Sequence, residues 1–316
     1  MAERILTQRE LNRALLARQL LLERSKLPIA RAVERMGGVQ NQYAPNAYIR
    51  LWSCLDGFGR DDLTRALERR TVVQATLMRA TIHIASKRDF WPFAIAIRAA
   101  QKDWWLRVRK PRPDERELER TANELRALMA DGARRHEELA AVVGRGWGMV
   151  GPWLGLVRVP PSGTWERRRA HLFQTAERWV GPENVAPDEA LDHLVRRYLS
   201  GFGPASRTDI AAWAGLNVRD LAPALERLSL RRFRDEDGKS CSTSPARPFP
   251  IRTRPPRSGS CQPGTRRFSS THAGRGSCPS ASARSSSTRR IRRPCRRSSW
   301  TAPSREPGGT TAVAST

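Results

Sequence analysis

The distribution of leucine constrains the fold of this chain more than any other feature. Leucine is abundant up to Lys239, but the last 77 residues contain none. Those residues hold 17 Ser, 15 Arg and 10 Pro, a composition that cannot bury enough apolar surface to form a core. We therefore expect a folded body over residues 1–239 and a disordered tail over residues 240–316.

The composition of the tail also indicates a change of reading frame. Arg, Ser, Pro, Ala and Cys without Leu are what a GC-rich coding sequence gives out of frame. Plausible codons for the tail, read in a shifted frame, give leucine-rich text with an Asp-Gly turn between alternating apolar residues. We interpret residues 240–316 as an out-of-frame translation. Its four cysteines lie too far apart in sequence to predict a zinc site.

The basic charge is not confined to the tail. The whole chain has a formal net charge of +26, and the tail contributes +14 of it because it holds one acidic residue, Glu306. Residues 1–239 keep 42 basic and 30 acidic side chains, a net charge of +12. This excess favours a polyanionic partner, although a solubilising surface explains the same charge.

Other features bear on the compartment. Residues 1–4 lead directly into an amphipathic segment, so we expect no secretion signal. The most apolar stretch, residues 90–100, is too short to span a bilayer. Cys54 is the only cysteine before Ser240, which is typical of a reducing cytoplasm. We expect a cytoplasmic, nucleoid-associated monomer that uses no membrane, metal or cofactor.

The first hundred residues have the pattern of a winged helix. Thr7 and Glu10 have the spacing of a capping box, and the leucines that follow have helical spacing. A second helix from Ile29 ends at a Gly-Gly pair. Residues 71–86 alternate and are rich in β-branched residues, which predicts a short hairpin. Helices closed by a hairpin make a winged-helix unit, which we place at residues 1–100.

The same plan recurs in the next part of the chain. Residues 134–143 predict a helix, and residues 153–159 predict a strand. The strand turns at Pro160-Pro161-Ser162-Gly163 and continues through Thr164 and Trp165. We place a second winged helix at residues 101–180.

A third copy begins near Tyr198. Ser206 caps a helix with Asp209 at its third position, Gly215 ends that helix, and residues 217–228 predict another. Residues 233–239 start a wing with Asp237-Gly238 as its turn. We place the helix-turn-helix of a third, incomplete winged helix at residues 181–239. The fold class is mainly α with short β-hairpins (α+β), in tandem winged-helix units, and a helical protein–protein module is the alternative.

Three strings together resemble the AlkZ/YcaQ-like winged-helix DNA glycosylase family. They are GGVQNQYAPNAYIRLW (37–52), LMRATIHIAS (77–86) and GFGPASRTDIAAWAGL (201–216). The resemblance covers about residues 5–239. It implies tandem winged helices around a concave surface that binds double-stranded DNA, and the removal of alkylated or cross-linked purines.

The resemblance also implies catalytic residues, because the family's Gln-x-Gln motif matches Gln40-Asn41-Gln42. Asn41 stands where the family usually has a small or apolar residue. Ala80 replaces the glycine that usually precedes Thr81. Both departures fit a relative that binds DNA without cutting it.

The chemistry of glutamine is consistent with such a site. A Gln amide is no general base, but it can orient water and stabilise a developing cation through its carbonyl oxygen. That is sufficient when an alkylated, positively charged purine is already a good leaving group. Gln40 and Gln42 follow a Gly-Gly break, so an extended segment would point both amides the same way.

Several other residues are candidates for contacts with DNA. Arg50 and Arg79 near the motif, and Arg207 and Arg219 in the third unit, are suited to phosphate contacts. His83 lies between two isoleucines, so we expect it to point away from the apolar face and contact phosphate or the site. A structural hydrogen-bonding role is the alternative for His83.

Three hypotheses about function remain open. The first is a monofunctional DNA glycosylase for alkylated or cross-linked purines, acting on an open surface. The second is a noncatalytic winged-helix DNA-binding or regulatory protein. The third is an inactive, frameshifted product whose lost wing exposes its core.

Overall fold

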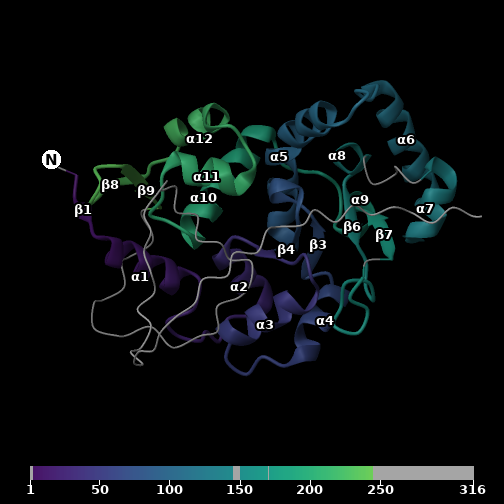
Figure 1. The fold of residues 1–316 in the computed structure, drawn as a ribbon. Helices are drawn as coiled ribbons and strands as arrows, with labels where there is room; N and C mark the ends of the chain where they lie inside the picture. The colour runs from purple at the N-terminus through teal and green to yellow at the C-terminus, as the bar shows by residue number, and fades with distance from the viewer. Residues whose placement is uncertain (1–2, 145–149, 170, 245–316) are drawn as a thin grey trace, which may run out of the picture. The chain divides into compact units, whose positions relative to one another are not determined.

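The computed structural model describes residues 3–144, 150–169 and 171–244 (Figure 1). These residues are mainly helical, with a three-stranded and a six-stranded sheet. The fold class predicted from the sequence is therefore confirmed. The interpretation of the tail concerns residues 240–316, of which residues 245–316 lie outside the described ranges.

The first unit begins with the predicted capping box. The Thr7 side chain accepts a hydrogen bond from the backbone of Glu10, and the Glu10 carboxylate accepts one from the Thr7 N–H. The second helix ends at Gly37, which has a left-handed φ of 76°. The elements are α1 (Gln8–Arg18), α2 (Ile29–Met36), β2 (Val39–Gln40), α3 (Pro45–Cys54), α4 (Arg60–Glu68), β3 (Val72–Thr76) and β4 (Ile82–Ser86).

The second unit differs from the prediction at its strand. Residues 151–154 form a short helix that ends at Gly155, so the strand covers only three residues. Pro152 in the first turn favours the helix because its missing N–H needs no partner there. The elements are α5 (Lys87–Val108), α6 (Glu115–Leu128), β5 (Arg134–Arg135), α7 (His136–Val143), α8 (Gly151–Leu154), β6 (Leu156–Arg158), β7 (Leu172–Thr175) and α9 (Ala176–Trp179).

The third unit has the predicted caps at Ser206 and Gly215. Its wing, however, does not stop at Lys239. β9 covers residues 240–243 and pairs with β8, and Thr243 is fully buried. The expectation that disorder begins at residue 240 is therefore wrong for residues 240–244. The elements are α10 (Pro187–Gly201), α11 (Arg207–Ala214), a 3₁₀ turn (Val218–Leu221), α12 (Ala222–Arg227), β8 (Arg231–Asp235) and β9 (Ser240–Thr243).

The N-terminal strand completes the sheet of the third unit. β1 (Ile5–Leu6) pairs in parallel with β8, which gives the strand order β1-β8-β9. Leu6 is fully buried by this pairing. The beginning of the folded body therefore contributes to its last unit, a long-range contact that local sequence patterns do not predict.

The hairpins of the first two units form one sheet, with the strand order β2-β4-β3-β6-β7-β5. β3 and β6 join them, with Gln74 opposite Arg158 and Ala75 opposite Val157. The largest apolar core runs from β3 to α12, and α5 lies beside α10 within it (Figure 1). The division into units at residues 100 and 180 stays a prediction, because residue 100 lies within α5 and one apolar core includes residues on both sides of each boundary.

Candidate active site

Gln40 and Gln42 lie on the edge of the six-stranded sheet, at the end of β2. The backbone continues in strand pairing past Gln40, because the Asn41 N–H donates to the Ile82 carbonyl at 2.7 Å. Gln40 and Gln42 are exposed, whereas the Asn41 side chain is 1% exposed. This alternation is what an extended backbone produces, and it puts both Gln side chains on the same side.

The buried residue between them anchors the next helix. The Asn41 Oδ1 accepts a hydrogen bond from the Ala47 N–H at 3.2 Å, in the first turn of α3. That turn has free N–H groups to satisfy because helix ends leave four of them without intrahelical partners. Asn41 therefore connects the motif to α3.

Each Gln amide oxygen already accepts one hydrogen bond from the protein. The Gln42 Oε1 accepts from the Ile82 N–H at 2.7 Å. The Gln40 Oε1 accepts from Arg79 Nη2 at 3.3 Å. An amide oxygen has two lone pairs, so each keeps one for water or for a developing cation.

His83 is opposite Gln40 in the β2–β4 pairing, but it is not a surface residue. Its side chain is 2% exposed, and its Nδ1 lies 2.9 Å from the Thr81 carbonyl oxygen. A carbonyl only accepts, so Nδ1 carries the proton. The pKa of His83 is lowered to about 4, mainly by burial and in smaller part by the charge of Arg79, while the hydrogen bond with the Thr81 carbonyl raises it.

The expectation that His83 contacts a phosphate is therefore corrected to a structural position. It failed because both faces of β4 are covered: Ile84 packs in the core of the first unit, and Ala85 packs in the core shared with α5 and α10. Alternation beside isoleucines identifies an exposed face only when one face of the strand meets water.

Arg79 lies beside the motif in a tight connection between β3 and β4. It has a left-handed φ of 55° within a 3₁₀ turn, Met78–Ala80. Its Nη1 donates to the Trp213 carbonyl at 2.6 Å, and its Nη2 donates to Gln40. Burial lowers the pKa of this half-buried guanidinium.

Arg50 is not where a phosphate can reach it. Its side chain is 6% exposed, and Nη2 donates to the backbone oxygen and the Oε1 of Gln19 at 2.8 and 2.9 Å. Nη1 contacts the sulfur of Cys54. The expected DNA contact is therefore corrected to a buried link between α3 and the end of α1. The sequence predicts that Arg50 lies in a helix, but it does not show which face of that helix α1 covers.

The two arginines of the third unit are accessible. Arg207 is exposed at the start of α11. Arg219 has a side chain 87% exposed, with its Nε 3.7 Å from the Asp220 carboxylate. Both remain candidates for phosphate contacts. The structure thus brings Gln40, Gln42, Arg79 and His83 together, whereas these two arginines belong to another helix-turn-helix.

Sequence reasoning missed a contact between the motif and the second unit. Tyr43 follows Gln42 and is 49% exposed, and its hydroxyl accepts from Arg168 Nη1 at 2.7 Å. Arg168 belongs to the exposed run Arg167–Arg169 in the loop between β6 and β7. In the same loop, the Trp165 N–H donates to the Tyr48 hydroxyl at 3.2 Å. The sequence offered two signals for this contact, namely an aromatic residue beside the motif and three arginines after a Pro-Pro turn.

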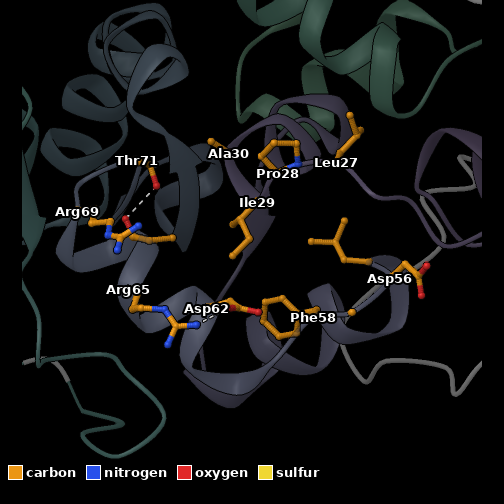
Figure 2. Close-up of a pocket in the computed structure, with 13 residues that line it drawn as sticks. Leu27, Pro28, Ile29, Ala30, Asp56, Phe58, Asp62, Arg65, Arg69 and Thr71 are labelled. Atoms are coloured by element: carbon orange, nitrogen blue, oxygen red, sulfur yellow. Dashed lines mark hydrogen bonds and ion pairs between the residues drawn. The ribbon is translucent and has the colours of Figure 1, made fainter.

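Two cavities of the described chain lie away from the Gln pair. Figure 2 shows one of about 390 Å³ between α2, α4 and the loop after α3, where Ile29 and Phe58 point inward and Arg65 and Arg69 lie at the rim. Another, of about 470 Å³, lies where α5 begins, beside residues 180–184. Neither is lined by Gln40 or Gln42, and both Gln side chains are exposed.

The described ranges also give no sign of a metal centre or a membrane segment. Within them, no three residues among His, Cys, Asp and Glu are placed to hold a metal ion. None of their helices combines the length and the apolar character that crossing a bilayer requires.

Comparisons with known proteins give a family match and a similar fold. Residues 33–258 match the sequence model of the family described as DNA glycosylase AlkZ-like. Among solved structures, the DNA glycosylase AlkZ of Streptomyces sahachiroi is similar, with a TM-score of 0.65 and 20% identity over 76% of this chain and 70% of that one. A comparison with curated proteins found no match. The family match continues past Lys239, where the change of frame was expected.

Proposed function

Because the chain belongs to the AlkZ-like DNA glycosylase family, we propose that it is a monofunctional glycosylase that excises alkylated or cross-linked purines from double-stranded DNA. It acts as a cytoplasmic monomer on DNA of the nucleoid. Gln40 and Gln42 are the catalytic residues. Arg207 and Arg219 bind phosphates of the same duplex.

The observation that carries this proposal is the exposure of two amides on either side of a buried residue. Gln40 and Gln42 point to the same side of an extended segment, and Asn41 is buried between them. The Gln42 amide is held by the Ile82 backbone, so its orientation is set before substrate binds. A preorganised dipole costs no reorganisation when charge develops beside it.

The proposed reaction needs no strong base. The C1′–N9 bond of an N7-alkylated purine breaks, and its electron pair neutralises the positive charge of the base. The deoxyribose becomes an oxocarbenium-like cation, which an amide oxygen stabilises. Water held by the second amide then adds to C1′ and loses its proton to solvent. Two glutamines suffice because the lesion supplies the leaving-group activation.

The open position of the Gln pair suits a bulky or tethered substrate. An enzyme that rotates a base into a closed pocket needs a base free to leave the duplex. A cross-linked purine is attached to both strands and cannot leave. Both Gln side chains are exposed, and neither of the cavities described above is lined by them, which supports the proposal of a site that approaches the lesion from the groove.

The alternative is a noncatalytic DNA-binding or regulatory protein. It is favoured by the departures at Asn41 and Ala80 from the pattern of the family, and by the cationic Arg79 beside the Gln40 oxygen. A positive charge at that oxygen weakens its attraction for a cationic sugar. Under this alternative the Gln pair contacts DNA without promoting bond cleavage.

Treatment of a duplex with one N7-alkylguanine distinguishes the two. We expect an abasic site, seen as a strand break only after heating in alkali, and no covalent adduct on borohydride reduction, because a Gln amide forms no Schiff base. A protein that leaves no alkali-labile site, yet binds one undamaged sequence in preference to others, would support the noncatalytic alternative.

A further inference from the structure

Arg79 adopts a backbone conformation that arginine rarely takes. Arg79 and Ala80 both have left-handed φ values, 55° and 54°. The turn is held by backbone bonds between Leu77 and Thr81, and Gln101 donates to the Leu77 carbonyl at 2.7 Å. Strained residues that the surrounding structure holds firmly are concentrated at functional sites. The strain here directs one side chain toward the Gln pair.

The guanidinium of Arg79 links the first unit to the third. Nη1 donates to the carbonyl of Trp213, near the end of α11, and Nη2 donates to the amide oxygen of Gln40. A planar guanidinium presents its donors at fixed angles, so one contact restricts the direction of the other. The position of α11 therefore sets the orientation of the Gln40 amide.

The contact with α11 is close at the backbone as well. Gly215, which ends α11 with a φ of 79°, lies so near that an added Cβ would be 3.2 Å from the N and Cα of Arg79. Trp213 packs against Phe93 and Tyr198 in the shared core. The contact between Arg79 and α11 is therefore part of the packed fold.

These contacts differ from those of a phosphate-binding arginine. Such a residue presents its guanidinium to solvent, as Arg207 and Arg219 do. Arg79 is half-buried and directs one nitrogen to a buried core element and the other to Gln40. Its geometry suits holding an amide better than meeting a DNA backbone.

We propose that Arg79 is a positioning residue that acts through Gln40, holding the Gln40 amide in place and making the third unit part of the active site. This inference rests on the proposed glycosylase function. It replaces the phosphate contact expected for Arg79 from the sequence.

The proposal also assigns different roles to the two glutamines. With a guanidinium on its oxygen, the Gln40 amide is a stronger N–H donor and a weaker partner for a cation, so it orients water. The Gln42 oxygen has only a neutral N–H as its partner, so it is the one that faces the cationic sugar. Arg79 thereby gives different roles to two side chains that have the same chemistry.

A double-mutant cycle tests this inference, with single-turnover release of 7-methylguanine and duplex affinity measured for each variant. We expect Arg79→Met to lower the release rate at least tenfold. In a Gln40→Ala background it should lower the rate no further, because the Arg acts through that amide. Affinity for undamaged duplex and its salt dependence should stay within twofold of wild type. The matched variant Arg207→Met should weaken binding and lower the salt slope by about 0.9.

Additive losses from Arg79→Met and Gln40→Ala, or weaker binding with a lower salt slope, would overturn the inference in favour of a phosphate contact. If Arg79→Met does not fold, Arg79→Lys tests the inference instead, because one ammonium group cannot donate to Trp213 and Gln40 with the fixed geometry of a guanidinium. An intermediate release rate would support the inference, and a wild-type rate would overturn it. Absence of release by the wild-type protein would overturn the proposed function and this inference together. Additivity in an active enzyme overturns the inference alone.

Discussion

The amide oxygen of Gln42 accepts a hydrogen bond from the backbone N–H of Ile82 at 2.7 Å. This bond ties an exposed side chain on the sheet edge to β4, the neighbouring strand. This N–H belongs to the backbone of the sheet, so the fold fixes its position. The amide of Gln42 is therefore oriented by the fold itself, and its second lone pair has a defined direction.

Shortening the side chain at position 42 by one methylene should separate the effect of its length from the effect of its amide group. Gln42→Asn keeps the amide but cannot span the distance from its Cα to both Ile82 and a substrate. We expect the single-turnover rate to fall roughly 10- to 100-fold, because small misplacements of a reacting group are costly. The same change at exposed Gln8, in α1, is the control and should leave the rate unchanged. Equal rates for both variants would contradict the positional role of Gln42.

Stability should depend on pH through His83. Its pKa is about 4 in the folded protein and near 6.5 when unfolded, so between these values the unfolded chain binds more protons. The stabilisation is complete above pH 6.5 and is lost as pH falls toward 4. We expect a loss of about 3 kcal/mol, measured by urea unfolding between pH 7.5 and pH 4.

Substitution of His83 tests the origin of this pH dependence. His83→Asn should lower stability at pH 7.5 but remove most of the dependence on pH that His83 causes. An unchanged slope in His83→Asn would show that His83 is not held neutral by its burial.

The arginines on the surface and in the interior should respond differently to substitution. Arg207→Ala and Arg219→Ala should each lower the salt slope of DNA binding by about 0.9, with stability changed by less than about 0.5 kcal/mol. Arg50→Met should instead lower stability by about 2 kcal/mol, because it leaves the part-buried oxygens of Gln19 without this donor. A change of salt slope in a folded Arg50→Met protein would contradict the buried position of Arg50.

The loop that carries Arg168 should depend on one glycine. A Cβ at Gly163 would overlap the amide of Gln74, which is 3% exposed and cannot swing into water, and the φ of Gly163 is 73°. We expect Gly163→Ala to cost roughly 2 kcal/mol or more, measured by thermal unfolding. Gly57 is the matched control because it is also left-handed, with nothing within 4 Å of an added Cβ. Its alanine variant should cost only about 1 kcal/mol.

The parts of the fold that depend on short-range chemistry could be predicted. The capping boxes at Thr7 and Ser206 and the helix ends at Gly37 and Gly215 follow from residues a few positions apart, and each is confirmed. The alternation around Asn41 belongs to the same class, because the period of an extended chain decides which side chains share a side.

The parts that could not be predicted depend on distant segments. Arg50 is buried because Gln19 at the end of α1 covers it, and His83 is buried because its strand lies between two apolar cores. A basic or polar residue in a helix or strand reads as exposed until its neighbours are known. The contact between Tyr43 and Arg168 was not predicted for the same reason, because it joins two residues that are 125 positions apart.

The boundary of the folded body shows a limit of compositional reasoning. Leucine disappears after Lys239, yet β9 forms over residues 240–243 because strand pairing needs backbone groups and only alternate buried side chains. Cys241 and Thr243 supply those side chains. The interpretation of a changed reading frame stays a prediction, and sequencing the gene across codons 236–245 would test it.

The central claim is that Gln40 and Gln42 break the bond between an alkylated purine and its sugar. The most direct measurement is chromatography of free 7-methylguanine released from duplex DNA under single-turnover conditions. We predict release by the wild-type protein and loss of at least 100-fold in the Gln40→Ala, Gln42→Ala double variant, with unchanged folding. Release at the wild-type rate by that variant would contradict the claim, as would a folded wild-type protein that binds the duplex and releases nothing.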